Sequence, residues 1–401
     1  MNTNTNPPMP RRAFLASAAA ATTFTVLKPA TVFGQSANSI LEIGLIGCGG
    51  RGRWIADLFA QSGKYRFVAC ADYFRDRVDA TGEKFKIDRA RRYTGLSGYK
   101  RLLESKLDAV VIETPPYFHP QQAMDAVEAG RHVYTAKPIA VDAPGCLTIG
   151  EAGKRATEKK QVFLVDFQTR ANEHFQKAVG EVHKGAIGKL VLAEAFYPWS
   201  GGGRGTPPAT AEEKLRSWYY ELALSGDFIV EQSIHALDVA TWIINADPVR
   251  ARGVGGHRVR PANSIYDHFA VQYTFADGLV LSFTCIQSIP FVKDEIRARA
   301  FGADGVIDLD YYGNVFLRGR EMSVRANVGD LYTSGAVANI NTFHDLVTKG
   351  DYSNRTVAPS VRSNLTAVLG REAAYRGTEI TLADLIQEGK RLQPDLRGVK
   401  S

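Results

Sequence analysis

Cysteine is scarce in this chain of 401 residues, and its placement excludes two classes of protein. The four cysteines, Cys48, Cys70, Cys146 and Cys285, form no Cys-x-x-Cys pair and show no spacing typical of zinc ligands. Cys48 and Cys70 stand in apolar runs, where a free thiol packs as a small hydrophobic side chain. We therefore expect neither a disulfide framework nor a cysteine-based metal site, and the histidines show no metal-ligand spacing either.

A strong excess of one charge is also missing. The formal net charge is +7, but Arg11, Arg12 and Lys28 lie in the first 34 residues, which contain no acid; without these three the net charge is +4. The sequence contains no cluster of Lys and Arg with interleaved aromatic residues, which nucleic-acid binding requires. We therefore expect no nucleic-acid partner. A hydrophobic content of 45% is ordinary for a soluble globular protein, and the length favours two domains.

The N-terminus lacks an apolar run long enough to span a bilayer, which takes ~20 strongly apolar residues. Arg11 and Arg12 precede an apolar stretch over residues 13–27, and small residues follow it. This pattern is typical of a signal peptide, and the paired arginines indicate the twin-arginine type. We expect residues 1–36 to be a twin-arginine signal that directs the folded protein, through the export machinery, to the periplasm. A disordered tail or a membrane anchor is the alternative.

A glycine-rich motif follows a second, mostly apolar run, which covers residues 40–46. The motif consists of Gly47, Cys48, Gly49, Gly50, Arg51 and Gly52. It reads Gly-x-Gly-x-x-Gly between a predicted strand and a helix-like run, which is the context that a dinucleotide site requires. Gly47 permits a tight turn, Gly49 lets the backbone approach a pyrophosphate, and Gly52 lets helix and strand pack closely. The helix N-terminus then offers free N–H groups to the phosphates.

An acid follows the second predicted strand. Residues 67–71 are apolar and end at Asp72, where a carboxylate can bind ribose hydroxyls and repel a 2′-phosphate. The sequence therefore predicts NAD as the cofactor in preference to NADP, although Arg51 and Arg75 weaken that preference. A solvated turn residue is the alternative role for Asp72.

Strands and helices continue to alternate after Asp72. Residues 108–112 and 132–134 read as buried strands, and residues 120–129 read as the helix between them. This alternation predicts a doubly wound parallel sheet whose ligand lies at the carboxyl ends of the strands. The further cofactor-site candidates at that edge are Thr114, Pro115, His119 and Lys137.

Five motifs in this order resemble the Gfo/Idh/MocA family of oxidoreductases. They are Gly-Cys-Gly-Gly-Arg-Gly at 47–52, Thr-Pro-Pro-Tyr-Phe-His at 114–119, Ala-Lys-Pro at 136–138, Phe-Gln-Thr-Arg at 167–170 and Glu-Gln-Ser-Ile-His-Ala-Leu-Asp at 231–238. The resemblance implies a Rossmann domain over 39–155. It also implies an α/β substrate domain over 156–392, with a large open, mainly antiparallel sheet that commonly forms homo-oligomer contacts. Strand-like runs in the second half, with a hairpin signal at Asp277-Gly278, agree with that fold.

Two positions depart from the usual family motifs. Ala136 stands where the family usually has the Glu of Glu-Lys-Pro, which leaves Lys137 without a neighbouring carboxylate. Glu231 stands where the family usually has Asp, four residues before His235, which keeps the charge on a longer side chain. Both departures bear on the substrate more than on the chemistry.

The oxidation of a secondary alcohol requires a hydride acceptor, a base and a group that stabilises the alkoxide. Glu231 and His235 lie four residues apart in a predicted helix over 230–243, which places both on one helix face. With an unperturbed pKa of ~6.5, His235 is suited to act as the base. The resemblance implies that Lys137 holds the reacting hydroxyl and that Glu231 contacts the substrate. A structural histidine and a surface lysine are the alternatives.

Three further polar residues are candidates for substrate binding. Gln168 and Arg170 follow a predicted strand over 162–167, and Asp238 follows His235 on the predicted helix. A solvent-facing position is the alternative for Asp238.

The predicted function is hydride transfer between a sugar or polyol and an NAD that stays tightly bound, because the periplasm has no ready pool of free NAD. One alternative is an NAD-dependent glycoside hydrolase that works by transient oxidation and elimination. The other is a non-catalytic protein that binds a sugar or NAD on an inherited fold.

Overall fold

The computed structural model describes residues 39–205, 208–262 and 264–401. The predicted signal peptide at 1–36 lies outside the described residues. Within the described part, no helix combines the length and the apolar character that crossing a membrane takes.

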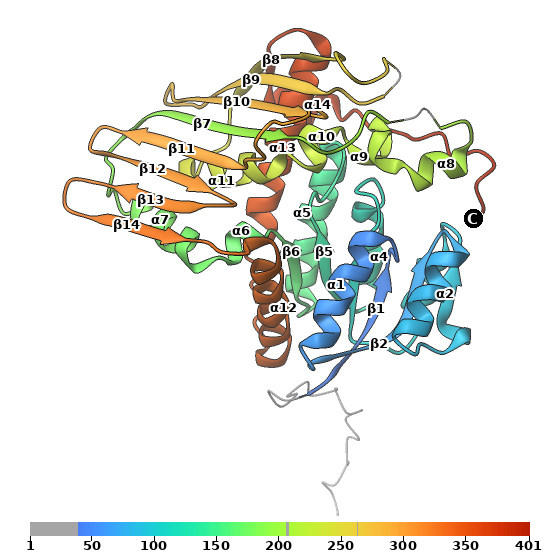
Figure 1. The fold of residues 1–401 in the computed structure, drawn as a ribbon. Coiled ribbons are helices and arrows are strands. Elements are labelled where there is room, and N and C mark those ends of the chain that lie inside the picture. Colours follow the sequence, from blue (N-terminus) through green and yellow to red (C-terminus); the bar gives the residue numbers. More distant parts are fainter. Residues whose placement is uncertain (1–38, 206–207, 263) are drawn as a thin grey trace, which may run out of the picture. The chain divides into compact units, whose positions relative to one another are not determined.

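The first half of the described chain builds a six-stranded sheet in the order β3-β2-β1-β4-β5-β6, and every neighbouring pair is parallel (Figure 1). The strands are β1 Leu41–Ile46, β2 Tyr65–Asp72, β3 Arg92–Thr94, β4 Ala109–Ile112, β5 His132–Ala136 and β6 Phe163–Asp166. The predicted doubly wound sheet is confirmed. The strand order reverses between β1 and β4, where such sheets bind their ligands. β6 extends the sheet past residue 155, the predicted domain boundary.

The segments between the strands form helices because apolar residues recur in them at helical spacing and pack against the sheet. In α1, for example, Ile55, Ala56 and Phe59 are fully buried against the sheet. The helices of this half are α1 Gly50–Gln61, α2 Arg75–Lys84, the 3₁₀ turn η1 Arg89–Arg91, α3 Gly98–Glu104, α4 His119–Glu128 and α5 Ala143–Glu158. α4 begins with His119 and Pro120, and this proline in the first turn lacks only an N–H that would have no helical partner.

The second half contains a nine-stranded sheet in the order β14-β13-β12-β11-β7-β10-β9-β8-β15. Its strands are β7 Leu190–Trp199, β8 Arg250–Gly256, β9 His268–Thr274, β10 Val280–Gln287, β11 Arg297–Gly302, β12 Gly305–Asp310, β13 Asn314–Arg318, β14 Ser323–Asn327 and β15 Ile380–Thr381. β7 and β10 pair in parallel and the other pairs are antiparallel, so the predicted mainly antiparallel sheet is confirmed. Asp277 and Gly278 form the predicted hairpin between β9 and β10, with Gly278 at φ 85°.

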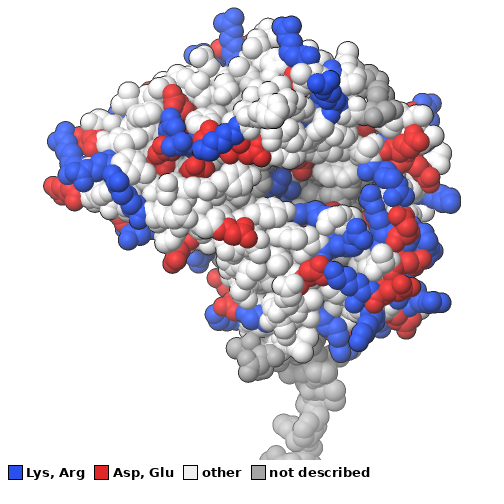
Figure 2. Space-filling model, in the orientation of Figure 1, with Lys and Arg blue, Asp and Glu red and all other residues white. Residues whose placement is uncertain are grey.

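The second half also contains helices, which range from single turns to a helix of 20 residues. They are α6 Gln168–Ala171, α7 Glu173–His183, α8 Ala211–Arg216, the 3₁₀ turn η2 Trp218–Tyr220, α9 Leu222–Ser225, α10 Phe228–Glu231, α11 Ile234–Ile244, α12 Leu331–Lys349, α13 Val357–Arg376 and α14 Leu382–Glu388. On the face that Figure 2 shows, basic and acidic side chains are interspersed.

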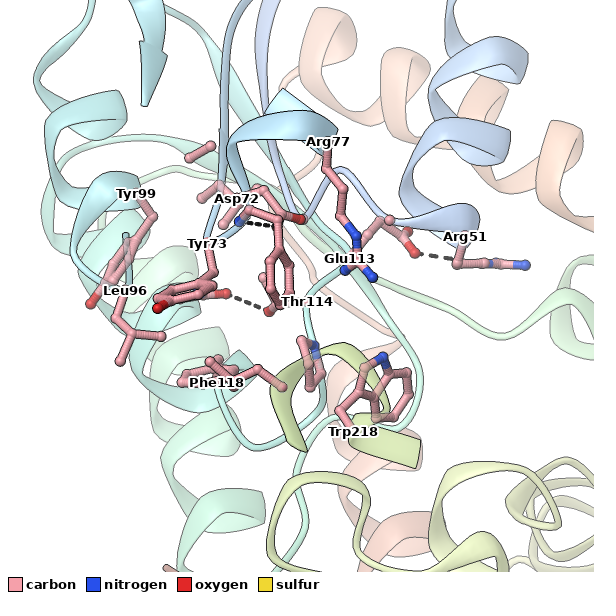
Figure 3. A pocket seen from close by; sticks show the side chains of 18 of the residues that line it. Arg51, Asp72, Tyr73, Arg77, Leu96, Tyr99, Glu113, Thr114, Phe118 and Trp218 are labelled. Atoms are coloured by element: carbon pink, nitrogen blue, oxygen red, sulfur yellow. Dashed lines mark hydrogen bonds and ion pairs between the residues drawn. The ribbon is translucent and has the colours of Figure 1, made fainter. Parts of the chain in front are cut away.

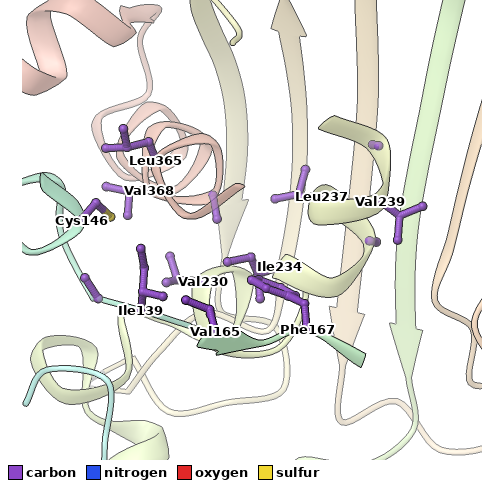
Figure 4. Packing of buried hydrophobic residues seen from close by; sticks show 14 of the residues in the cluster. Ile139, Cys146, Val165, Phe167, Val230, Ile234, Leu237, Val239, Leu365 and Val368 are labelled. Atoms are coloured by element: carbon purple, nitrogen blue, oxygen red, sulfur yellow. The ribbon is translucent and has the colours of Figure 1, made fainter. Parts of the chain in front are cut away.

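The helix α13 joins the two sheets. It packs on β8, α11 and α5, and its Leu365 and Val368 belong to one apolar cluster with Ile139 and Val230 (Figure 4). Two polar side chains of α13 add buried hydrogen bonds. The Asn364 amide accepts from the Ile139 N–H at 3.0 Å and donates to the Ala140 carbonyl at 3.0 Å. The Arg371 guanidinium donates to the carbonyls of Val141 at 2.6 Å and Gly226 at 3.0 Å. α13 therefore fixes the segment after β5 relative to the segment before α10.

Candidate active site

A nucleotide-sized cavity lies where the strand order reverses, at the carboxyl ends of β1, β2 and β4 (Figure 3). Two glycines of the motif are needed for packing. Gly47 has φ 98°, and a Cβ there would lie 2.6 Å from the main chain of Glu113. A Cβ on Gly52 would lie 1.9 Å from the Gly47 carbonyl oxygen. The turn and the helix-to-strand contact therefore both exclude a side chain.

The other two glycines leave space for a ligand. A Cβ on Gly49 would meet only the Arg77 guanidinium, at 3.7 Å, and a Cβ on Gly50 would meet no described atom within 4 Å. Both glycines line the cavity beside the N-terminus of α1, where free N–H groups favour phosphate. The residues present therefore fit the pyrophosphate of a dinucleotide.

Asp72 ends β2 at the wall of this cavity, as predicted. Its carboxylate accepts hydrogen bonds from the main-chain N–H groups of Cys48 at 2.7 Å and Phe74 at 2.9 Å. Burial raises the pKa of Asp72, and these N–H groups and Arg77 oppose the rise. The carboxylate thus fixes the glycine turn and keeps lone pairs for ribose hydroxyls. Cys48 contributes through its main chain, since its thiol is buried against the Ala71 carbonyl.

The loop after β4 connects the cavity to the second candidate region. Thr114 and Pro115 line the cavity, and the Thr114 hydroxyl donates to the Gln122 side chain at 2.6 Å. The buried His119 ring lies 2.7 Å from the Thr114 carbonyl and 2.8 Å from the Pro138 carbonyl. Burial lowers the pKa of His119 to about 4, so the ring is neutral and donates to one of the two. His119 therefore anchors this loop to the residues that follow Lys137.

A second pocket adjoins the first. The two share Arg51, Glu113, Thr114 and Trp218, so they meet at the end of the glycine motif. The second pocket encloses about 1140 Å³ of space free of protein atoms, including the part open to solvent. Aromatic side chains from the second half form much of its wall: Tyr197, Trp199, Trp218, Tyr219, Tyr311, Tyr312 and Tyr332.

Lys137, Glu231 and His235 all line this second pocket. The Lys137 ammonium donates to the main-chain carbonyl of Glu231 at 2.5 Å and lies 3.7 Å from the Glu231 carboxylate. Burial lowers the pKa of Lys137, and the nearby Glu231 carboxylate opposes that shift. The structure therefore supplies Lys137 with a carboxylate neighbour from the second half, although Ala136 supplies none.

His235 lies in the first turn of α11 and is 7% exposed. Its ring packs against Phe167 and Tyr311 at centroid distances of 6.2 and 5.6 Å. Its Nδ1 finds no hydrogen-bond partner among the described residues. Burial lowers the pKa of His235 well below its usual value, and the charges of Lys137 and Arg51 lower it further. The imidazole is therefore neutral near pH 7, with one ring nitrogen unprotonated.

The predicted continuous helix over 230–243 is wrong. α10 ends at Glu231 and α11 begins at Ile234, with Gln232 between them at φ −113°. The Gln232 side chain donates to the Tyr197 hydroxyl at 2.9 Å and accepts from the Tyr219 hydroxyl at 2.7 Å, which turns it toward the pocket. Glu231 and His235 thus reach the same pocket from two helices, and not from one helix face.

The three candidates for substrate binding lie elsewhere. Asp238 is fully buried and binds the Arg170 guanidinium through contacts of 2.9 and 3.0 Å, and it accepts from the Ser363 hydroxyl at 2.5 Å. The Gln168 amide donates to Asp166 at 3.3 Å. Neither pocket has Gln168, Arg170 or Asp238 among the described residues that line it. Their role in substrate binding therefore stays a prediction; in the structure Arg170 and Asp238 bind each other, and Gln168 binds Asp166 of β6.

A charged cluster at the junction of the pockets was missed. Arg51 donates to Asp166 at 2.6 Å and to the Tyr332 hydroxyl at 2.8 Å, and its Nε lies 3.5 Å from the Glu113 carboxylate. Within the described chain neither oxygen of Glu113 accepts a hydrogen bond, and burial raises the pKa of Glu113 to about 7. Asp166 ends a buried strand and Glu113 follows one. This shared position at the carboxyl edge of the sheet was the sequence signal that could have predicted the cluster.

One segment of the second half lines the nucleotide cavity, and another packs beside its wall. The arm, which we define as residues 211–220 (α8 and η2), contributes Leu215 and Trp218 to its wall. Segment 389–401 lies beside the same wall, where the Lys400 carbonyl accepts from the Leu96 N–H at 3.2 Å. The cavity is therefore closed by residues far from the glycine motif in sequence, as Figure 3 shows for Trp218.

Two family models match two successive parts of the chain. The oxidoreductase family with an NAD-binding Rossmann fold matches residues 41–167, and the GFO/IDH/MocA C-terminal domain matches residues 175–308. The chain belongs to the Gfo/Idh/MocA family. The predicted resemblance and the NAD cofactor are thereby confirmed at the level of the family.

Curated relatives of this Gfo/Idh/MocA protein include inositol dehydrogenases. The scyllo-inositol 2-dehydrogenase (NAD(+)) of Bacillus subtilis is 24% identical over 249 residues, which cover 60% of this chain and 65% of the relative. The inositol 2-dehydrogenase of Burkholderia lata is 26% identical over 272 residues, which cover 67% of this chain and 74% of the relative. The match thus spans slightly under two thirds of the Bacillus relative.

Solved structures share the fold. Levoglucosan dehydrogenase in complex with NADH has a TM-score of 0.71 at 17% identity, with 86% of this chain and 99% of that chain covered. Myo-inositol 2-dehydrogenase from Lactobacillus plantarum has a TM-score of 0.67 at 20% identity, with 86% and 99% covered. These similarities establish the architecture.

Proposed function

We propose that the protein is an NAD-dependent oxidoreductase that transfers a hydride between a secondary alcohol of a sugar or polyol and the nicotinamide. One observation carries the proposal. Lys137, Glu231 and His235 converge in a pocket that opens into the nucleotide cavity at Arg51, Glu113, Thr114 and Trp218.

Each reacting residue has a role that its surroundings support. NAD supplies the hydride acceptor when it is bound. The Lys137 ammonium, held by the main chain and carboxylate of Glu231, stabilises negative charge that develops on a substrate oxygen. The buried His235 ring is neutral and accepts the hydroxyl proton. Glu231 orients Lys137 and offers acceptors to substrate hydroxyls.

The pocket wall favours a ring-shaped ligand with many hydroxyl groups. Tyrosine and tryptophan rings present apolar faces to C–H groups, while their O–H and N–H groups remain available to hydroxyls. The names of the similar proteins, inositol dehydrogenase and levoglucosan dehydrogenase, point to the same class of compound.

The location, the retention of the cofactor and the assembly belong to the same proposal. The arginine pair near the N-terminus supports export of the folded protein to the periplasm with NAD already bound. Homo-oligomer formation through the nine-stranded sheet is supported by exposed apolar side chains on its strands, where Val191 is 65% exposed and Val254 is 64% exposed.

The proposal is tested by incubating the purified full chain with NAD and a panel of cyclic polyols and aldoses. Absorbance at the NADH wavelength should rise with at least one of them, and heat-denatured protein should release a dinucleotide. Absence of dinucleotide binding and of any alcohol oxidation overturns the proposal. Release of nitrophenol from a nitrophenyl glycoside, without accumulation of NADH, replaces it with hydrolysis.

A further inference from the structure

The wall of the nucleotide cavity near Asp72 carries an apolar cluster that is separate from the two main cores. Its buried members are Phe74, Leu215 and Leu224, and half-buried side chains complete it: Tyr73, Leu96, Tyr117, Phe118, Trp218, Leu396 and Val399. Three regions far apart in sequence supply these side chains. They are the nucleotide domain, the arm with α9, and segment 389–401.

The arm makes the direct contact with the cavity. Leu215 and Trp218 line it together with Asp72, Tyr73 and Phe74 (Figure 3). These three residues stand where β2 ends, on the side of the cavity that serves the adenosine half of a dinucleotide. Through Leu215 the arm therefore borders the part of the ligand that takes no part in hydride transfer, and through Trp218 it also reaches the second pocket.

Polar contacts fasten the arm to the nucleotide domain. The Tyr73 hydroxyl donates to the Glu212 carboxylate at 2.6 Å. The Arg216 guanidinium donates to both oxygens of Asp76 at 3.3 Å, and it lies 4.0 Å above the Phe74 ring. The Arg216 and Asp76 side chains are 51% and 65% exposed. Such exposed contacts are individually weak, so most of the resistance to opening the arm comes from its apolar contacts in the cluster around Leu215.

Segment 389–401 supports the arm from the other side. Its Lys400 main chain bonds both the Leu96 N–H, at 3.2 Å, and the Tyr73 hydroxyl, at 3.3 Å. The chain passes so close to Gly95 that a Cβ there would lie 2.4 Å from the Ser401 carbonyl oxygen. Leu396 and Val399 then pack against the cluster that holds Leu215. Gly95 and Leu96 line the cavity, so this segment supports one wall and the arm forms another.

We propose that the arm and segment 389–401 form a clasp that retains the adenosine half of the dinucleotide and sets its rate of release. This inference rests on the proposed function, because it names how the same nucleotide site keeps its cofactor. A ligand seated between Asp72 and Trp218 leaves only when the clasp opens. Release is then slow, which suits an enzyme whose cofactor is reduced and reoxidised in place.

The test measures dinucleotide release and needs no turnover. The full-length protein is loaded with NADH and mixed with excess NAD, and the loss of bound-NADH fluorescence gives the dissociation rate. The double variant Leu396→Ala/Val399→Ala and the variant Trp218→Ala should each release NADH about tenfold faster than the unsubstituted protein, and Arg216→Ala about twofold to fivefold faster. Association should also become faster, because an open clasp exposes the cavity.

Arg397→Ala is the matched control, because Arg397 lies in the same segment, is 91% exposed and pairs with Asp395 of that segment. Its release rate should equal that of the unsubstituted protein. Thermal unfolding of each ligand-free variant identifies any that has lost its fold, and Arg216→Ala, whose side chain is half exposed, then carries the test. Release rates within twofold of the unsubstituted protein in all clasp variants overturn the clasp alone. An unsubstituted protein that binds neither NAD nor NADH overturns the clasp together with the proposed function.

Discussion

The two pockets of this protein are built in different ways. The nucleotide cavity is built around a main-chain turn at the ends of neighbouring strands, where Gly47 and Gly52 have no room for a side chain and Asp72 binds main-chain N–H groups; side chains complete its walls. The second pocket is formed by side chains from many elements, and the three residues that we propose to react reach it from the position after β5, from α10 and from α11. A short motif therefore specifies the first site, whereas the second depends on how distant elements pack.

The largest expected effect separates the two pockets. Lys137→Ala should lower kcat/KM for the alcohol about a thousandfold, since it removes the charge that stabilises the substrate oxygen. The Kd for NADH should change less than about threefold, because the nucleotide cavity does not include Lys137. Steady-state kinetics and fluorescence titration measure the two effects, with the exposed Lys106→Ala as control. Equal losses in both would show that the pockets are not separable.

A second expected effect concerns a buried pair that serves neither pocket. Asp238→Ala leaves the Arg170 guanidinium without its carboxylate, and removal of one partner of such a pair costs about 3–5 kcal/mol. Urea unfolding should show this loss, while the KM for the alcohol should stay within about twofold of the original. A raised KM at unchanged stability would instead indicate that Asp238 contributes to substrate binding.

A third, slightly smaller effect appears where the pockets meet. The pKa of Glu113 is raised from 4.5 to about 7, which corresponds to about 3 kcal/mol. Because the folded-state pKa lies above the unfolded one, this contribution is fully present below about pH 4.5 and is lost as the pH rises through about 7. Glu113→Gln removes the titration. The melting temperature of the ligand-free variant should therefore fall less between pH 5 and pH 8 than that of the unsubstituted protein.

The control for Glu113 is Glu128→Gln, because the Glu128 carboxylate is exposed and its pKa is lowered by Lys159 and Arg155. A pH profile of melting temperature that is the same with and without Glu113→Gln would show that the Glu113 carboxyl does not titrate in this range.

The smallest expected effect lies at the clasp. The ion pair between Arg216 and Asp76 is exposed and contributes at most about 1 kcal/mol, and salt screens it. Raising the salt concentration should therefore speed NADH release from the unsubstituted protein more than from Arg216→Ala. Identical salt dependence in the two proteins would show that this ion pair does not affect the rate of NADH release.

Local patterns predicted the architecture well. The apolar runs before Gly47 and Asp72 became β1 and β2, and Asp277-Gly278 became the hairpin between β9 and β10. β13, β14 and the two-residue β15 were not predicted, because β13 is only five residues long and β14 and β15 contain too few apolar residues to give a strand pattern.

The site was predictable only in part, for a related reason. Lys137, Glu231 and His235 reached one pocket as the family resemblance implied. Helical periodicity did not reveal the interruption at Gln232, where the side chain binds Tyr197 and Tyr219 of distant segments, because such tertiary contacts leave no trace in the local pattern. Sequence spacing likewise gave no sign that Arg170 and Asp238 are bound to each other.

The helix α13 restricts how the substrate enters. Its Arg371 bonds the carbonyls of Val141 and Gly226 at the same time, and its Asn364 bonds the chain that follows Pro138. A hinge motion that swung one half away from the other would break these buried contacts. Hinge rotation of two domains around a ligand is a common way to open and close a site, but here it would cost the buried contacts of α13. We therefore expect the positions of Lys137 and His235 relative to each other to change little when a ligand enters.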